Sequence, residues 1–218
     1  MTPQVLVGTV SWHSRGVYLL TSCPGGASRS VVVHHLPRRS SQCPFRKNRG
    51  TVRDAKFHPA KPFLFVATDR NIRVYNLTSQ GLAKKLQVGG SGHVMGIDVH
   101  SSGDHLIVGL ADGRACWFDL DLSSTPYRSL RHHSLPVTGV AFHPRYPLFA
   151  TASDDGTCHV LHGMVYSDLM TNPLVVPLKA LKGDREKGGG GVQSCCFHPQ
   201  QPWVVTATDS GDVLMYCN

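Results

Sequence analysis

The stretch Phe142-His143-Pro144-Arg145-Tyr146-Pro147-Leu148-Phe149-Ala150 decides the fold, because it opens with one copy of a recurring anchor. The other copies are Ser11-Trp12-His13, Lys56-Phe57-His58-Pro59, Asp98-Val99-His100 and Cys196-Phe197-His198-Pro199. From one anchor histidine to the next the intervals are 45, 42, 43 and 55 residues. A period in the forties is typical of propeller blades. The sequence therefore predicts an all-β fold, a β-propeller.

Each period carries the same pattern of strands and turns after its anchor. An apolar run such as 63–66 or 105–108 is followed by a tight turn such as Asp112-Gly113 or Asp155-Gly156. Asp-Gly pairs supply the positive-φ residue that tight hairpins need. The returning strand alternates apolar and polar residues, which is typical of a half-buried strand. Outer strands are expected near 82–88, 127–130 and 174–181.

These patterns predict one WD40-type β-propeller domain over 1–218, in which five blades can be recognised. The repeats are expected at about 4–50, 51–91, 92–133, 134–191 and 192–218, the fourth with an insertion at 162–191. Four repeats hold four strands and the fifth holds three. We therefore expect part of a larger ring, with a closed ring of five blades as the alternative.

The anchor histidines are expected to be structural, because a residue that recurs in every blade has a packing role. They are His13, His58, His100, His143 and His198. In WD-type blades a histidine, a Ser or Thr, a turn Asp and an aromatic residue share a buried hydrogen-bond network, to which we assign these anchors. The adjacent pairs His34-His35 and His132-His133 should point to opposite faces of a strand, so we expect solvent exposure rather than a shared metal.

Several patterns that carry catalysis are missing from the chain. There is no GxSxG, HExxH or GxxxxGK[ST] pattern. The aspartates recur mainly at hairpin turns, where they bond their own backbone, so paired acid and base carboxylates are not expected. We predict no catalytic residue, no metal, no cofactor and no small-molecule substrate. The alternative class of a propeller with hydrolase activity would require acidic side chains that converge at the axis of the ring.

The net charge of +8 is unevenly distributed along the chain. Residues 1–109 hold 14 Lys and Arg against 4 Asp, a net charge of +10, and residues 110–218 hold 8 against 10, a net charge of −2. Such asymmetry attracts polyanions to one side of a folded domain. The seven cysteines form no CxxC pair and are expected to be free buried thiols of a reducing compartment. No apolar run approaches a membrane span, so we expect no membrane partner and a cytoplasmic or nuclear protein.

The basic stretch 37–49 and the neighbouring Arg53 form the candidate contact site. The cations are Arg38, Arg39, Arg46, Lys47, Arg49 and Arg53, with Phe45 among them. Arg and Lys beside an aromatic ring suit phosphate contacts with base stacking. Three interpretations stay open here: contact with RNA, contact with an acidic protein, and an inert basic surface.

Several stretches resemble the carboxy-terminal WD propeller of the block-of-proliferation (Bop/Erb) family of eukaryotic ribosome-biogenesis proteins. Similar runs are 11–19, 58–68, 116–124 and 142–150. The most specific run is His162-Gly163-Met164-Val165-Tyr166-Ser167-Asp168-Leu169 with Asn172-Pro173 after it, which is a signature of that family rather than of propeller blades. The resemblance covers essentially all 218 residues.

The resemblance implies a propeller of seven blades, of which this chain holds five. It also implies a non-enzymatic scaffold in large ribosomal subunit (pre-60S) assembly and large-subunit rRNA maturation. The implied partners are a pescadillo-type protein, a second WD-repeat protein and pre-rRNA, and the implied location is the nucleus, in the nucleolus and nucleoplasm. The competing hypothesis is a WD adaptor of another class, such as a substrate receptor of a ubiquitin ligase or a histone reader.

Overall fold

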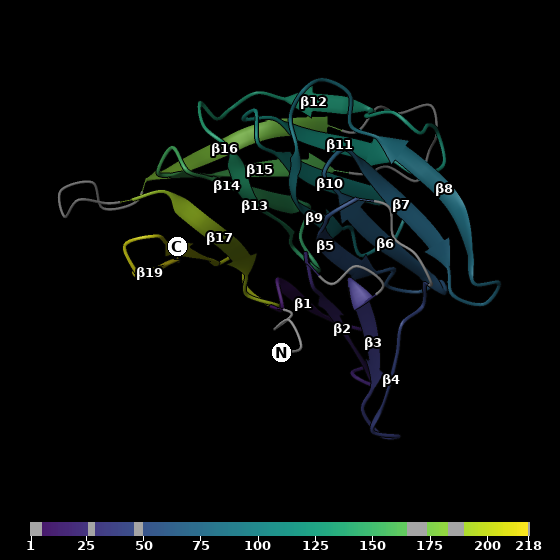
Figure 1. Cartoon of the computed structure of the whole chain (residues 1–218). Coiled ribbons are helices and arrows are strands. Elements are labelled where there is room, and N and C mark those ends of the chain that lie inside the picture. Colours follow the sequence, from purple (N-terminus) through teal and green to yellow (C-terminus); the bar gives the residue numbers. More distant parts are fainter. Residues whose placement is uncertain (1–5, 26–28, 46–49, 165–173, 183–189, 218) are drawn as a thin grey trace.

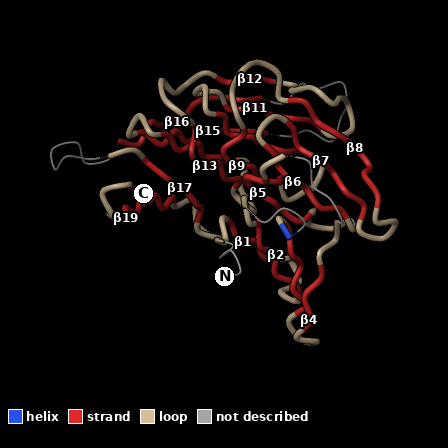
Figure 2. The backbone as a smooth tube through the Cα atoms, in the orientation of Figure 1, coloured by secondary structure: helices blue, strands red, loops and turns tan. Residues whose placement is uncertain are grey.

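A computed structural model describes residues 6–25, 29–45, 50–164, 174–182 and 190–217 of the chain. These residues form five antiparallel sheets, each of which is one blade of a β-propeller (Figure 1). The tube view shows the strands joined by short loops and turns (Figure 2). The all-β propeller fold predicted from the sequence is confirmed, and so is the set of five blades.

Four blades have four strands and the fifth has three, in chain order from the inner to the outer strand. The first blade contains β1 (Thr9–Trp12), β2 (Tyr18–Ser22), β3 (Val31–His35) and β4 (Ser40–Gln42). The second contains β5 (Val52–Phe57), β6 (Phe63–Thr68), β7 (Asn71–Asn76) and β8 (Gly81–Gln87). The third contains β9 (Val94–Val99), β10 (His105–Leu110), β11 (Ala115–Asp119) and β12 (Arg128–Leu130). The outer strands expected near 82–88 and 127–130 are therefore confirmed as β8 and β12.

The last two blades hold the longest and the shortest sheets. The fourth contains β13 (Val137–Phe142), β14 (Leu148–Ser153), β15 (Thr157–Met164) and β16 (Leu174–Lys182). The fifth contains β17 (Val192–Phe197), β18 (Val204–Thr208) and β19 (Val213–Tyr216). The outer strand expected near 174–181 is confirmed as β16, and residues 162–164 of the predicted insertion 162–191 belong to β15. Residues 165–173 and 183–189 of that stretch lie outside the described residues.

Consecutive blades pack face to face around an open arc, with the inner strands β1, β5, β9, β13 and β17 toward its centre (Figure 1). Each of the four boundaries between blades has its own apolar core. Leu20 and Leu64 belong to the first, Phe65 and Leu106 to the second, Trp117 and Phe149 to the third, and Cys158 and Val204 to the fourth. Fully burying such side chains contributes about 1.5–3 kcal/mol each, so stacking of blades holds the fold together.

In the three middle blades the second strand is covered on both faces, which explains its sequence. In β10 every residue is buried, because one face packs against the second blade and the other against the fourth. Such a strand is a continuous apolar run rather than an alternating one. Tight turns then reverse the chain. Gly113, Gly156 and Gly211 have φ of 79°, 79° and 89°, which confirms the positive-φ turns predicted from the sequence.

Candidate functional site: the strand-end surfaces of the propeller

The five anchor histidines make the same contacts at the same place in every blade. Each ring accepts a hydrogen bond at Nδ1 from the backbone N–H two residues later; for His143 this is Arg145, at 3.0 Å, and Tyr146 N–H donates to the same atom at 2.9 Å. The equivalent bonds involve Arg15, Ala60, Ser102 and Gln200. Each ring thus caps the turn between the first two strands of its blade. This geometry supports a structural role for the five histidines.

The anchor turns of neighbouring blades also touch. His143 Nε2 donates to Gln201 O of the fifth blade at 3.0 Å, and Ser14 Oγ donates to Pro59 O of the second blade at 2.9 Å. A Cβ added to Gly103 would lie 2.2 Å from Cε1 of His58, so that turn leaves room for glycine alone. We call the end of the strands that carries these five turns the anchor face.

The buried network that we assigned to the anchors lies elsewhere, at the opposite end of the strands. His133 Nδ1 lies 3.0 Å from Asp155 Oδ2, and His133 Nε2 lies 2.8 Å from Thr151 Oγ1. The His133 side chain is only 1% exposed, so the expected exposure of the His132-His133 pair is wrong for His133 and holds for His132. His34 and His35 are half-buried on β3, which also departs from the expectation.

Burial and neighbouring groups determine the charge states of His133 and Asp155. Burial lowers the pKa of His133 below its ordinary value, although Asp155 opposes the effect. Burial alone would raise the pKa of Asp155, but hydrogen bonds from Thr157 Oγ1 and the Ser134 amide, together with His133, hold that pKa below its ordinary value. The pair therefore favours a neutral ring beside a carboxylate, which suits a structural clamp.

The predicted basic site is divided by the fold. Arg38 and Arg39 lie exposed in the turn between β3 and β4, on the anchor face. Arg53 lies near the start of β5, at the opposite strand end, where its Nε donates to Asp69 Oδ1 at 2.7 Å. Arg46, Lys47 and Arg49 lie outside the described residues. Because Arg38 and Arg39 lie at one strand end and Arg53 at the other, these three residues do not form the single site that the sequence predicted.

Phe45 does not project among the cations as base stacking requires. Its ring packs on Tyr75 with centroids 3.8 Å apart and an interplanar angle of 30°, against the apolar core between the first two blades. The stacking surface that we expected from Phe45 is therefore occupied by the protein itself.

The family-signature residues divide between described and undescribed parts of the chain. His162, Gly163 and Met164 end β15, and Gly163 packs so closely on Trp117 and Phe149 that an added Cβ would lie 2.8 Å from each ring. Tyr166, Asp168, Asn172 and Pro173 lie outside the described residues. The described signature residue Gly163 therefore contributes to packing between the third and fourth blades.

Two inner-strand carboxylates were missed by the sequence reasoning. Asp54 on β5 accepts a hydrogen bond from Ile97 N–H on β9 at 3.1 Å, and Asp98 on β9 accepts one from Phe142 N–H on β13 at 2.7 Å. Lys56 Nζ lies 3.9 Å from Asp98 Oδ1. Burial raises the pKa of both carboxyls above the ordinary value, and Lys56 opposes this. The available signal was that both acids fall inside strands rather than at turns.

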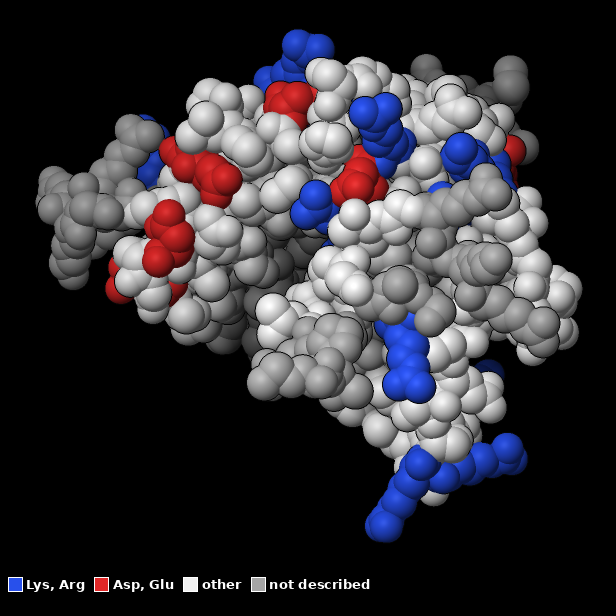
Figure 3. All heavy atoms as spheres, in the orientation of Figure 1, with Lys and Arg blue, Asp and Glu red and all other residues white. Residues whose placement is uncertain are grey.

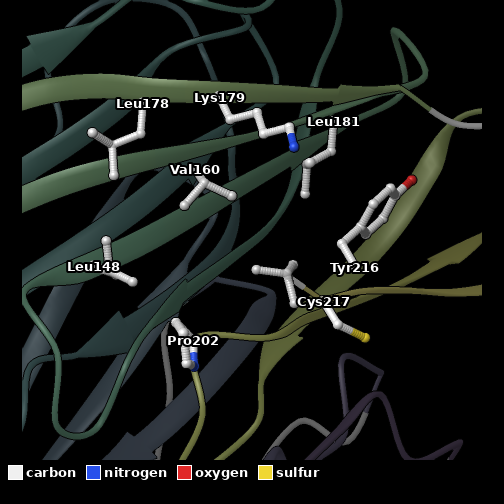
Figure 4. Close-up of a pocket in the computed structure, with 9 residues that line it drawn as sticks. Leu148, Val160, Leu178, Lys179, Leu181, Pro202, Tyr216 and Cys217 are labelled. Atoms are coloured by element: carbon white, nitrogen blue, oxygen red, sulfur yellow. The ribbon is translucent and has the colours of Figure 1, made fainter.

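A groove of about 280 Å³ runs between the fourth and fifth blades (Figure 4). Leu148, Val160 and Leu181 line it on the side of the fourth blade, and Pro202 and Tyr216 on the side of the fifth. The Tyr216 hydroxyl donates to Lys182 O at 3.1 Å. The lining is predominantly apolar and suits packing rather than chemistry.

All seven cysteines are free; Cys23, Cys116, Cys158 and Cys195 are buried as expected, whereas Cys43, Cys196 and Cys217 are exposed. Within the described ranges, no cluster of three or more His, Cys, Asp or Glu side chains has the geometry to hold a metal ion. The described residues also include no helix that is long and apolar enough to cross a membrane.

Comparison with known proteins defines the class of the chain. The family model described as "WD domain, G-beta repeat" matches residues 40–76, 84–119, 124–161 and 176–216, which is more than half of the chain. The chain therefore belongs to the WD40 family. Each match starts in or next to the outer strand of one blade and ends in the third strand of the next, so every sequence repeat links two blades.

The relatives narrow the class further. The chain is 54% identical over 213 residues to "Ribosome biogenesis protein BOP1 homolog" of Chlamydomonas reinhardtii, a match that covers 97% of this chain and 27% of that protein. It is 49% identical over 210 residues both to "Ribosome biogenesis protein erb1" of Schizosaccharomyces pombe and to "Ribosome biogenesis protein BOP1" of Homo sapiens, covering 96% of this chain and 28% of each relative. The chain thus spans less than a third of the length of these relatives. The resemblance to the Bop/Erb family predicted from the sequence is confirmed.

Proposed function

We propose that this chain acts as a non-enzymatic scaffold in ribosome biogenesis, in pre-60S assembly and large-subunit rRNA maturation. The observation that carries the proposal is the identity of about half of all residues with proteins named for ribosome biogenesis, over nearly the whole chain. The blades support it, since a propeller held by four separate cores presents fixed surfaces at both strand ends.

The proposed partners are a pescadillo-type protein, a second WD-repeat protein and pre-rRNA, and the proposed location is the nucleolus and nucleoplasm. The proposal of the two protein partners and of the location rests on the family resemblance. The proposal of pre-rRNA as a partner rests on charge, because the amino-terminal half of the chain has a net charge of +10. Figure 3 agrees with this division: blue side chains extend from the first blade, and red ones gather over the carboxy-terminal blades.

Affinity purification of the tagged chain from cells tests the proposal. We expect enrichment of large-subunit rRNA precursors and of large-subunit assembly proteins over a tag-only control. Recovery of ubiquitin-ligase or chromatin subunits without pre-ribosomal RNA would contradict the proposal and favour a WD adaptor of another class.

A further inference from the structure

We propose that the anchor face of the first blade, through Arg15, Arg38 and Arg39, binds the phosphate backbone of RNA. The inference rests on the RNA contact in the proposed function and assigns it to one surface. It replaces the contiguous basic stretch predicted from the sequence, which the fold divides between the two strand ends.

The three arginines lie on two turns that contact each other. Arg15 belongs to the turn between β1 and β2, and Arg38 and Arg39 belong to the turn between β3 and β4. Leu36 N–H at the second turn donates to Val17 O at the first, at 3.0 Å. Both turns lie on the anchor face because β1 and β3 run in the same direction in the sheet.

The charge of these arginines is not neutralised nearby. Residues 1–53 contain no Asp or Glu, so the first blade has no carboxylate of its own. In the described part of the chain no ion pair involves the three side chains, all of which are exposed. The tip of the first blade carries blue side chains with no red beside them in Figure 3.

Several cations of the second and third blades differ in this respect, and those blades, unlike the first, contain carboxylates. Arg53 pairs with Asp69 at 2.7 Å, Lys61 with Asp104 at 3.3 Å, and Arg114 with Asp112 at 2.8 Å. Exposed cations without a partner carry the positive potential that draws a polyanion. The first blade therefore has the surface best suited to phosphate.

A cavity of about 340 Å³ beside Arg39 offers further hydrogen-bond donors. Leu19 and Leu36 form its apolar part, and its polar lining is Arg39, His34, His35, Ser40 and Ser41. His35 Nδ1 accepts the Arg38 N–H at 3.1 Å, so Nε2 is the donor atom of this ring. The Ser41 hydroxyl already bonds His34 Nδ1 at 2.8 Å. The Arg39 guanidinium, the His35 N–H and the Ser40 hydroxyl suit the oxygens of a phosphate, which can only accept.

The distribution of charge favours a nucleic-acid backbone over a single phosphate group. One phosphate would use the cavity beside Arg39 alone. Arg38 and Arg15 continue the positive surface away from it, and the Ser14–Pro59 bond carries the anchor face on to the second blade. Successive cations on one surface match successive phosphates, and contacts of this kind read no sequence.

The experiment compares two triple variants of the 218-residue chain. Arg15→Gln, Arg38→Gln and Arg39→Gln remove the proposed surface; Arg70→Gln, Arg128→Gln and Arg131→Gln remove three exposed arginines elsewhere. Each set lowers the formal net charge from +8 to +5. Binding of a fluorescein-labelled single-stranded oligouridine is followed by anisotropy across a salt titration, and circular dichroism melts check that both variants remain folded. A double variant, Arg38→Gln with Arg39→Gln, replaces the first triple if that triple unfolds.

We expect the anchor-face variant to bind more weakly and the control to bind like the original chain. The slope of log K against log salt should become shallower by about 2, since each lost contact with a single strand removes about 0.7. Equal weakening of both triples, or an unchanged anchor-face variant, overturns the inference while leaving the proposed function intact. No binding by the original chain overturns the inference and the RNA contact of the proposed function, while the scaffold role is tested separately by affinity purification. Displacement of the oligonucleotide by a singly phosphorylated peptide at similar concentration would overturn the assignment to RNA.

Discussion

Asp98 on the third blade accepts a hydrogen bond from the backbone N–H of Phe142 on the fourth, at 2.7 Å. The same relationship joins Asp54 to Ile97 N–H one boundary earlier, and Thr138 Oγ1 donates to Val192 O one boundary later. Side chains of inner strands therefore bind the backbone of the next blade at three successive boundaries. These bonds supplement the apolar cores, and they fix the position of one blade relative to the next.

Replacing Asp98 by alanine should destabilise the protein by about 1–3 kcal/mol, because the Phe142 N–H loses its acceptor in a partly buried place. Asp98→Asn keeps an acceptor oxygen and should cost less. Urea denaturation measures both. Equal losses for the two variants would show that the carboxylate acts through charge rather than through this hydrogen bond.

Gly103 and Gly16 occupy the same position in the anchor turns of two blades, with φ of 86° and 69°. Gly16→Ala should cost only the strain of the left-handed backbone, about 1–2 kcal/mol, since nothing lies within 4 Å of its added Cβ. Gly103→Ala should cost clearly more, because its Cβ would meet the His58 ring at 2.2 Å. Urea denaturation compares the two, and equal costs would contradict the close contact.

His143 contacts both its own turn and the next blade, so two substitutions separate its roles. His143→Asn can supply an acceptor in place of Nδ1, whereas His143→Gln can supply a donor in place of Nε2. We expect His143→Ala to lower the free energy of unfolding by about 2–3 kcal/mol, with partial recovery in each amide variant. Recovery in neither would mean that packing of the ring on Phe197, at 5.2 Å between centroids, dominates.

Acidification should weaken the fold through its buried histidines. Burial lowers the pKa of His58, His100 and His133 below 6.5, so between 6.5 and the folded pKa the unfolded chain binds more protons than the native protein. Their stabilisation is full above about pH 6.5 and is lost as the pH falls through the folded pKa values. Urea denaturation at about pH 7.5 and about pH 5.5 tests the sign.

The raised pKa of Asp98 acts in the opposite direction, because the native protein takes up that proton first and gains stability as the pH falls. Asp98→Asn lacks this gain and should lose more stability on acidification than the original chain. A chain that becomes more stable from about pH 7.5 to about pH 5.5 would contradict the histidine prediction.

The blades could be predicted because their pattern is local: anchor, apolar run, turn and alternating strand all lie within one period. The hydrogen bonds between inner strands of neighbouring blades join residues more than forty positions apart, and the repeat period does not say which residues face each other. Nothing in the sequence around Asp98 indicates that its carboxylate accepts a hydrogen bond from Phe142 of the next blade. His133 looked exposed until the fold placed Asp155 and Thr151 around its ring.

The basic site shows the same limit. Arg38 and Arg53 are fifteen positions apart in the sequence, yet a short outer strand and a connection separate the strand ends on which they lie. Charge counted along the chain pointed to the first blade, where Arg38 and Arg39 lie exposed. It could not say at which strand end each cation lies, because strand direction reverses at every turn.

Sedimentation of cell extract through a sucrose gradient tests the assignment to ribosome biogenesis most directly. The tagged chain should migrate with particles that contain large-subunit rRNA precursors and should leave those fractions when the extract is treated with ribonuclease. A chain that stays at the top of the gradient, or that migrates in fractions free of pre-ribosomal RNA, would contradict the proposed role.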